Sequence, residues 1–254
     1  AGSTHTCGIL LNGSMQCWGR NDYGQATPPA GTFTQVSSGD YHTCGIHMDE
    51  TMSCWGDDRH GQLDVPEGHF LQVSSGENHV CAVKRDQTLA CWGHNSYREA
   101  TARDGEFIMV STAQRHTCAL RADQTLICWG WNEFGQSTAP MGLFSFITTG
   151  ESTYRAQSCG INTDDQLICW GNGIGTPPEQ SFISVSAGAR HACGITEDQG
   201  ISCWGDDEEG QLTAPTGLFK KITSGGDHNC AIDLDDRVSC WGKNDQGQLD
   251  WSTP

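Results

Sequence analysis

Basic residues are scarce in this chain of 254 residues, where 14 lysines and arginines stand against 31 aspartates and glutamates and the formal net charge is −17. Binding to a nucleic-acid backbone needs clustered positive charge, so the composition argues against a nucleic-acid partner. Hydrophobic residues make up 36% of the chain, and no run approaches the ~18 apolar residues of a membrane-spanning helix. We therefore also expect no membrane span.

Helical and catalytic signals are missing as well. No window sustains the 3.6-residue hydrophobic period of an amphipathic helix. The chain has no Gly-x-Ser-x-Gly elbow, no phosphate-binding loop and no His-Glu-x-x-His motif. We expect a protein that is not an enzyme, with no catalytic residues, no metal and no cofactor.

A repeat dominates what the chain does contain. The tripeptide Cys-Trp-Gly occurs seven times, at intervals of 37, 37, 37, 41, 34 and 37 residues. Another cysteine lies ten residues before each one, so the pairs account for all 14 cysteines. A period near 37 residues indicates an array of similar supersecondary units. The pairs are Cys7 and Cys17, Cys44 and Cys54, Cys81 and Cys91, Cys118 and Cys128, Cys159 and Cys169, Cys193 and Cys203, and Cys230 and Cys240.

Each unit holds short apolar runs bounded by Gly, Asp, Asn and Pro, such as Phe70–Val73, His79–Val83 and Leu89–Gly93. Runs of this length between turn residues are typical of β-strands. Seven units of three or four strands predict an all-β fold, a seven-bladed β-propeller forming a single domain over residues 1–254. A linear β-solenoid is the alternative, although its coils are usually shorter.

The first unit lacks the Phe-x-x-Val segment that opens most of the others, because the chain starts at Ala1 with Gly2–His5 following directly. We expect the first blade to be one strand short, with an unpaired edge near Thr4–Ile9. Such edges recruit other chains, so strand donation by a partner is a possible way to complete the blade.

The units resemble the repeats of the regulator-of-chromosome-condensation family. The shared pattern is Gly-x-x-His before one strand, as at Gly39–His42, and Trp-Gly-x-Asn-x-x-Gly-Gln after another, as at Trp18–Gln25. The resemblance implies a seven-bladed propeller. The compact units look most like the propeller-type β-lactamase inhibitory protein, and the paired cysteines look like the ectodomain repeats of Crinkly-type receptor kinases. Such propellers include an exchange factor, inhibitors and receptor domains, so the fold alone does not define the function.

The pattern has three departures. Arg98-Glu99 stands where Gly-Gln is expected, and the loop after Trp170 is three residues short. Between Gly150 and Cys159 there are four extra residues, and Gln157 replaces the usual histidine.

The cysteine spacing predicts one disulfide per blade. Asn12-Gly13 marks a tight hairpin tip, which places Cys7 directly opposite Cys17 on the neighbouring strand. Zinc bound by His5, Cys7 and Cys17 is the alternative, although zinc sites normally use close pairs such as Cys-x₂-Cys. Disulfides at this density indicate an oxidising compartment, and we expect an extracellular or periplasmic protein.

Antiparallel connectivity sends alternate loops to opposite faces. The Gly-x-x-His and Asn-x-x-Gly loops share one face, whose aromatic and arginine side chains are of the kind that dominates protein interfaces. The other face carries the Pro-x-Gly segments and acidic hairpin tips such as Asp49-Glu50. We interpret these tips as a solvated surface, and calcium binding is the alternative. The residues expected to bind a partner are Tyr23, Tyr41, Tyr97, Arg115, Trp131, Tyr154, Arg155 and Arg190.

A histidine two residues before the first cysteine recurs in six units, as at His5 and His42. Six copies at one position favour a packing and hydrogen-bonding role over catalysis. The sequence therefore predicts a secreted binding protein that recognises a protein partner, as an inhibitor or a receptor-like module. A carbohydrate-binding lectin is the alternative, and a nucleotide-exchange factor is a weaker one.

Overall fold

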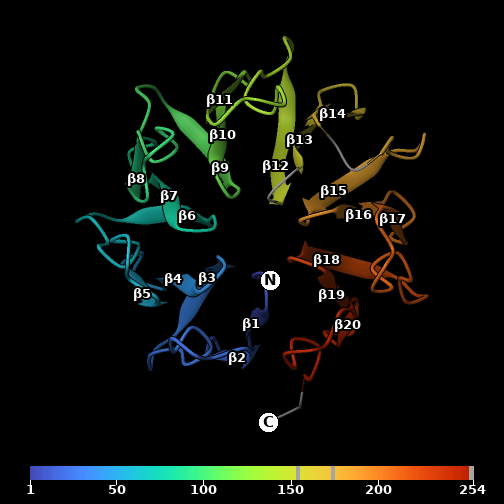
Figure 1. Cartoon of the computed structure of the whole chain (residues 1–254), viewed down its shortest axis with the longest axis horizontal. Helices are drawn as coiled ribbons and strands as arrows, with labels where there is room; N and C mark the ends of the chain where they lie inside the picture. Colours follow the sequence, from blue (N-terminus) through green and yellow to red (C-terminus); the bar gives the residue numbers. More distant parts are fainter. Residues whose placement is uncertain (153–154, 173–174, 252–254) are drawn as a thin grey trace.

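The computed structural model describes residues 1–152, 155–172 and 175–251, which form twenty β-strands and no helix. The strands build seven sheets arranged as blades around a central axis (Figure 1). This confirms the predicted all-β, seven-bladed propeller. None of the described residues forms a helix long and apolar enough to cross a membrane.

The first blade has two strands and each of the others has three. The blades are, in order, β1 (His5–Ile9) and β2 (Met15–Gly19); β3 (Phe33–Ser38), β4 (His42–His47) and β5 (Met52–Gly56); β6 (Phe70–Ser75), β7 (His79–Lys84) and β8 (Leu89–Gly93); β9 (Phe107–Thr112), β10 (His116–Arg121) and β11 (Leu126–Gly130); β12 (Phe144–Ser152), β13 (Arg155–Asn162) and β14 (Leu167–Gly171); β15 (Phe182–Ala187), β16 (His191–Thr196) and β17 (Ile201–Gly205); β18 (Phe219–Ser224), β19 (His228–Asp233) and β20 (Val238–Gly242).

Within each three-stranded blade the chain runs outward from the central axis, and all pairings are antiparallel (Figure 1). The inner strand opens with a phenylalanine, after which the register with the middle strand shifts, as between Phe33 and Gln35. The insertion in the fifth unit lengthens this inner hairpin, so that Glu151 pairs with Ala156 and Ser152 with Arg155.

The hydrophobic core lies between neighbouring blades. Phe70 and Val73 of β6 pack against Ile46 of the preceding blade, and the Trp92 ring centroid lies 6.4 Å from that of Phe70. Burying one such side chain contributes about 1.5–3 kcal/mol, and every complete blade repeats the arrangement. The equivalent phenylalanines Phe33, Phe107, Phe144, Phe182 and Phe219 are all buried.

All 14 cysteines form the predicted disulfides within blades, each between residues ten positions apart. The two cysteines of a pair lie directly opposite on the middle and outer strands, as Cys44 and Cys54 do with a Cα–Cα distance of 4.1 Å. Because no cysteine remains free, the alternative of zinc ligation by Cys7 and Cys17 is wrong.

The Gly-x-x-His turn brings the blades together at the centre. The Gly39 N–H donates to the His42 carbonyl at 2.9 Å, which closes a tight turn. A Cβ at Gly39 would lie 2.2 Å from the Gly76 carbonyl oxygen of the next blade and 2.4 Å from His42 Cε1. Glycine is therefore required by close approach, and the same contact between Gly225 and Gly2 joins the last blade to the first.

Candidate functional site: the loop face

The loop face consists of the Gly-x-x-His turns and the Asn-x-x-Gly loops, which lie on one side of the ring as the sequence predicts. Arg20, from an Asn-x-x-Gly loop, lies over the ring of Tyr41, from a Gly-x-x-His turn, at 5.3 Å. On the opposite face the hairpin tips meet the segments before the inner strands, as where the Phe33 N–H donates to the Gly13 carbonyl at 2.8 Å.

A buried glutamine fixes the conformation of each regular Asn-x-x-Gly loop. The Gln25 side-chain oxygen accepts the Tyr23 N–H at 2.9 Å, and its backbone carbonyl accepts the indole N–H of Trp55 at 2.9 Å and the hydroxyl of Thr43 at 3.1 Å. The residue before the loop glycine is thus held by the core of the next blade. In five other loops a backbone N–H likewise donates to the side-chain oxygen of the residue two positions later. The donors are His60, Tyr97, Phe134, Glu209 and Gln246.

The irregular third unit keeps this loop with different chemistry. Glu99 replaces the glutamine and is fully buried, where it accepts the Tyr97 N–H at 2.7 Å and contacts His94 Nδ1 at 2.5 Å. Arg98 adopts the positive φ of 64° that glycine has in the other units. The substitution of Arg98-Glu99 for Gly-Gln therefore keeps the positive φ and the side-chain bond that the regular loops have.

The residue held in this way by a glutamine, or by Glu99 in the third blade, is aromatic in the first four blades, and the side chains of these loops form groups of contacting aromatic and arginine residues. Tyr23 packs edge-on against Tyr41 at 5.4 Å, with Arg20 over Tyr41 and Arg59 over Tyr23. Further round the ring, Arg115 lies between Tyr97 and Trp131, which in turn contacts Phe134. The His60 and His94 rings, 5.1 Å apart, lie between these groups in chain order. We call Arg20, Tyr23, Tyr41, Arg59, His60, His94, Tyr97, Arg115, Trp131 and Phe134 the aromatic sector.

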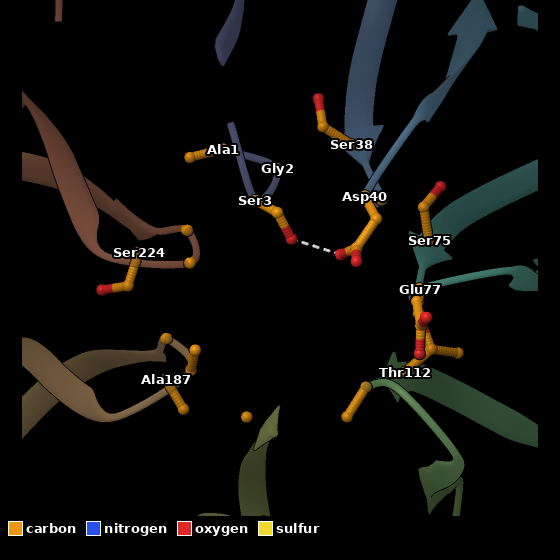
Figure 2. Close-up of a pocket in the computed structure, with 18 of the residues that line it drawn as sticks. Ala1, Gly2, Ser3, Ser38, Asp40, Ser75, Glu77, Thr112, Ala187 and Ser224 are labelled. Atoms are coloured by element: carbon orange, nitrogen blue, oxygen red, sulfur yellow. Dashed lines mark hydrogen bonds between the residues drawn. The ribbon is translucent and has the colours of Figure 1, made fainter. Parts of the chain in front are cut away.

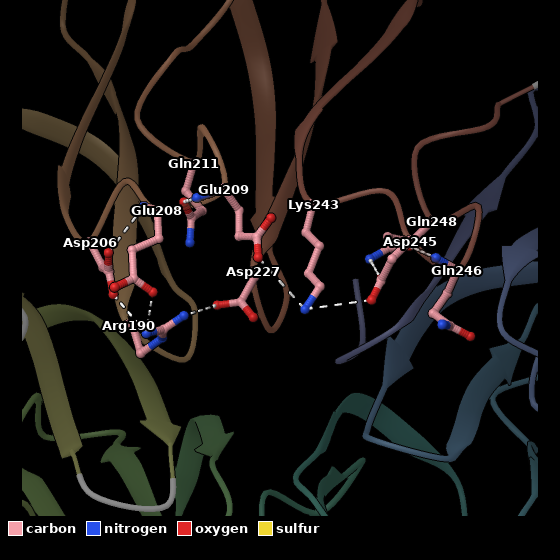
Figure 3. A network of polar contacts seen from close by, with 10 residues as sticks. All are labelled: Arg190, Asp206, Glu208, Glu209, Gln211, Asp227, Lys243, Asp245, Gln246 and Gln248. Atoms are coloured by element: carbon pink, nitrogen blue, oxygen red, sulfur yellow. Dashed lines mark hydrogen bonds and ion pairs between the residues drawn. The ribbon is translucent and has the colours of Figure 1, made fainter.

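The last two blades present a different surface on the same face. Arg190 contacts three carboxylates, at 2.9 Å from Asp206, 3.1 Å from Glu208 and 3.5 Å from Asp227. Lys243 lies 3.8 Å from Glu209 and 3.6 Å from Asp245 (Figure 3). We call these residues, with the exposed Asp207, the acidic sector. Its two cations are surrounded by carboxylates, so the sector as a whole is negative.

A polar channel runs along the axis between the inner strands. Its volume is about 430 Å³, and serine, threonine, glycine and alanine residues of the inner strands line it. Asp40 and Glu77 stand at its mouth, where Ser3 donates a hydrogen bond to Asp40 (Figure 2). Small hydroxyl side chains leave this opening wide and weakly apolar, so it offers little surface for a hydrophobic ligand.

Buried histidines connect the blades beneath the loop face. His5 Nε2 lies 2.7 Å from the hydroxyl of Thr43 in the next blade, and that hydroxyl also donates to the Gln25 carbonyl. A hydroxyl has one proton, so Nε2–H of His5 must be the donor. Burial lowers the pKa of His5 to about 3, which keeps its ring neutral at pH 7. The recurring histidine is therefore a structural link between blades.

The structure assigns most of the predicted binding residues to the two sectors. Tyr23, Tyr41, Tyr97, Arg115 and Trp131 lie together in the aromatic sector. Arg190 lies on the same face in the acidic sector, held by carboxylates. Tyr154 lies outside the described residues, and Arg155 begins β13 with its side chain undescribed.

The set of predicted binding residues left out several members of the aromatic sector. Arg20, Arg59, His60, His94 and Phe134 each contact another sector residue. The available signal was the position before the loop glycine, which reads Tyr, His, Tyr and Phe when the first four units are aligned. Arg20 carries no such signal, because its contact with Tyr41 depends on how adjacent blades meet.

Solved structures similar to this chain include receptor ectodomains. The CRINKLY WD40 ectodomain of the Arabidopsis thaliana receptor kinase ACR4 is 28% identical, with a TM-score of 0.80 over 96% of this chain and 93% of that one. The ectodomain of the Physcomitrella patens receptor kinase CR4 is 25% identical, with a TM-score of 0.82 over 95% of this chain and 71% of that one. Yeast RCC1 (Prp20) bound to Kap60 is 12% identical, with a TM-score of 0.76 over 96% of this chain and 79% of that one, and shares the fold alone.

No curated protein matches the sequence closely enough to count as a relative. The regulator of chromosome condensation (RCC1) repeat matches residues 1–25, 33–62, 70–99, 112–136, 182–211 and 219–248. These segments cover more than half of the sequence and include the Gly-x-x-His turns and Asn-x-x-Gly loops that build the loop face. The chain therefore belongs to the RCC1 repeat family.

Proposed function

We propose that this chain is a secreted, non-enzymatic binding module that recognises a protein partner through the aromatic sector, in the manner of an inhibitor or a receptor ectodomain. The observation that carries the proposal is a series of aromatic residues in four successive blades, each with its backbone N–H held by a buried glutamine or, in the third blade, by the buried Glu99. The rings of Tyr23 and Tyr97 pack against neighbouring aromatic and arginine side chains, and each residue is 42% exposed and so available for contact. Fixed aromatic and arginine side chains lose little conformational entropy on binding, which makes them effective anchors at protein interfaces.

A protein partner is favoured over a glycan for two reasons. The oriented position differs from blade to blade, whereas a lectin built on repeats would present near-identical sets. Arg20 and Arg59 also lie over the rings of Tyr41 and Tyr23, and so occupy faces on which a sugar would stack. The acidic sector adds selectivity for a partner that carries basic residues opposite it.

The disulfides and the similarity to receptor ectodomains support an extracellular location. One disulfide in every blade requires an oxidising compartment for assembly. The nucleotide-exchange alternative has weaker support, because the similarity to yeast RCC1 at 12% identity concerns the fold alone.

The test compares capture by three immobilised forms of the chain from the extracellular fluid of the source organism. The variant Tyr23→Ala/Tyr97→Ala/Trp131→Ala should lose the partner that the unchanged chain retains, because anchors of this kind cost about 2 kcal/mol each when truncated. Met141→Ala is the matched control, since Met141 is fully exposed on the opposite face. Both variants should melt at nearly the temperature of the unchanged chain.

The chemistry of the captured species decides between the two classes of ligand. Protease treatment of the partner should abolish binding, while periodate oxidation of its sugars should leave binding intact. The opposite pattern would make the chain a lectin. Equal capture by the triple variant would mean that the aromatic sector is not the binding surface.

A further inference from the structure

The hairpin tip of the first blade carries an asparagine where the other blades carry an aspartate. Five residues after the first cysteine of each unit, the sequence has Asn12 in the first blade and aspartate in the other six. Gly13 and Ser14 follow, so the tip reads Asn-x-Ser with a residue other than proline in the middle. This tripeptide is the acceptor sequence for N-linked glycosylation in secreted proteins. No other asparagine of the sequence has serine or threonine two residues later.

The turn at this tip needs only the side-chain oxygen of the asparagine. Asn12 Oδ1 accepts the Ser14 N–H at 2.9 Å and the Ser14 hydroxyl at 2.7 Å. In the third blade the Asp86 carboxylate accepts the equivalent N–H and hydroxyl of Thr88, at 3.0 and 2.7 Å. Because an aspartate closes the same turn with the same two bonds, the fold does not account for the amide nitrogen of Asn12.

That amide nitrogen is also available for reaction. Asn12 is exposed, and among the described residues its Nδ2 has no hydrogen-bond partner. Other asparagines use this atom in the fold: the side-chain amide of Asn21 donates to Thr27 at 2.9 Å, and that of Asn132 to Thr138 at 3.0 Å. The one asparagine in an acceptor sequence is therefore one whose nitrogen makes no bond within the described structure.

The position of the tip leaves room for a bulky group. The Gly13 carbonyl accepts the Phe33 N–H at 2.8 Å, which holds the tip against the second blade on the face opposite the loop face. Leu11, the neighbour of Asn12, is 88% exposed. A glycan at this tip would extend into solvent, shield Leu11 from water and leave the aromatic sector uncovered.

We propose that Asn12 is an N-glycosylation site. The donor is an oligosaccharide carried on a lipid diphosphate, and a transferase of the secretory pathway catalyses the step. A bond forms between Asn12 Nδ2 and the anomeric carbon of the sugar, while the bond from that carbon to the diphosphate oxygen breaks. The amide nitrogen loses one proton, and the lipid diphosphate leaves. The inference rests on the extracellular location that belongs to the proposed function, because donor and transferase act on chains that enter that pathway.

The experiment maps the peptides of the chain recovered from the extracellular fluid of its source organism, before and after digestion with a peptide-N-glycosidase. We expect the peptide that contains Asn12 to carry an oligosaccharide attached through N-acetylglucosamine. The enzyme should release the sugar and leave aspartate at position 12.

Three variants, secreted from a eukaryotic cell line, separate the acceptor from the turn. Asn12→Asp should lose the glycan completely and melt at nearly the temperature of the enzymatically deglycosylated chain, because it gives the tip the residue of the other six blades. Ser14→Thr should keep the glycan, since threonine preserves the acceptor hydroxyl and stands at this position in the next three blades. Asp49→Asn creates Asn-x-Thr in the tip of the second blade and should gain a second glycan there.

Three outcomes would overturn the proposal. Asn12 without sugar in the extracellular chain is one, and a glycan that persists in Asn12→Asp is another. Neither affects the capture test of the aromatic sector, which uses residues on the other face, so the proposed binding function would stand. The third is absence of the chain from the extracellular fluid, which would overturn the extracellular location together with this site.

Discussion

At the scale of single residues, His42 differs from the other histidines beneath the loop face. Both of its ring nitrogens are buried without a hydrogen-bond partner in the described structure. The cause lies in the next blade, where Val80 stands at the position that Thr43 and Thr117 occupy elsewhere. A buried donor without a partner costs about 1–3 kcal/mol, so this position carries an avoidable loss of stability.

Replacing Val80 by threonine should therefore stabilise the protein. The two side chains have nearly the same shape, and the new hydroxyl would accept from His42 Nε2–H and donate to the Gln62 carbonyl, as Thr117 does with His79 and Glu99. We expect Val80→Thr to raise the free energy of unfolding by about 0.5–1.5 kcal/mol in chemical denaturation.

The reverse substitution is the control for this prediction. Thr117→Val should lower the free energy of unfolding by about 1–3 kcal/mol, because it leaves His79 without its partner. If Thr117→Val leaves the free energy of unfolding unchanged, the histidine link between blades contributes nothing to stability.

At the scale of the element, the hairpin formed by the middle and outer strands of each blade is held at two places, its turn and its disulfide. The acidic residue of most tips closes the turn locally: the Asp86 carboxylate accepts both the N–H and the hydroxyl of Thr88, which lowers the pKa of Asp86. The next residue, Gln87, has a positive φ of 65°. These tip aspartates thus have a structural reason to recur, and the disulfide fastens the same two strands further along.

Removal of one disulfide measures how much the bridge contributes to the free energy of unfolding. A double variant Cys81→Ala/Cys91→Ala should lose about 2.5 kcal/mol of unfolding free energy, because the bridge closes a loop of about ten residues and restricts the unfolded chain. Denaturant unfolding with the other six bridges intact provides the measurement. A loss below about 0.5 kcal/mol would mean that the blade is held by packing alone.

At the scale of the whole molecule, the buried histidines tie stability to pH. Burial lowers the pKa of His5, His79 and His228 to about 3 and that of His42 to about 4. In the unfolded chain a histidine titrates near 6.5, so between pH 6.5 and 4 the unfolded state binds protons that the folded state does not. Their contribution to stability is therefore complete above about pH 6.5 and declines as the pH falls.

The free energy of unfolding should accordingly fall steeply from pH 7 to pH 5, with each of these histidines adding up to about 1.4 kcal/mol per pH unit. His228→Gln should reduce the slope, and glutamine already occupies this position in the fifth unit, at Gln157. His69→Gln is the control because His69 is exposed. A slope that is the same in all three proteins would contradict the explanation.

The sequence by itself determined the features that depend on short-range geometry. Ten residues between paired cysteines, with a turn signal such as Asn12-Gly13 between them, leave one antiparallel register, so the disulfides followed directly. The period of the repeat and the short strands determined the fold class in the same way. The division of the loops between the two faces followed from strand alternation.

Only the tertiary structure decided the features that depend on how one blade meets the next. Arg20 and Tyr41 come from neighbouring blades, as do Arg190 and Asp227, and their contacts require the spacing and tilt that packing between blades sets. The Ala1 amine donates to the Thr223 hydroxyl at 2.8 Å, because the ring brings its last blade beside its first. Local sequence patterns carry no information on such distances, since many packed arrangements satisfy the same strand periodicity.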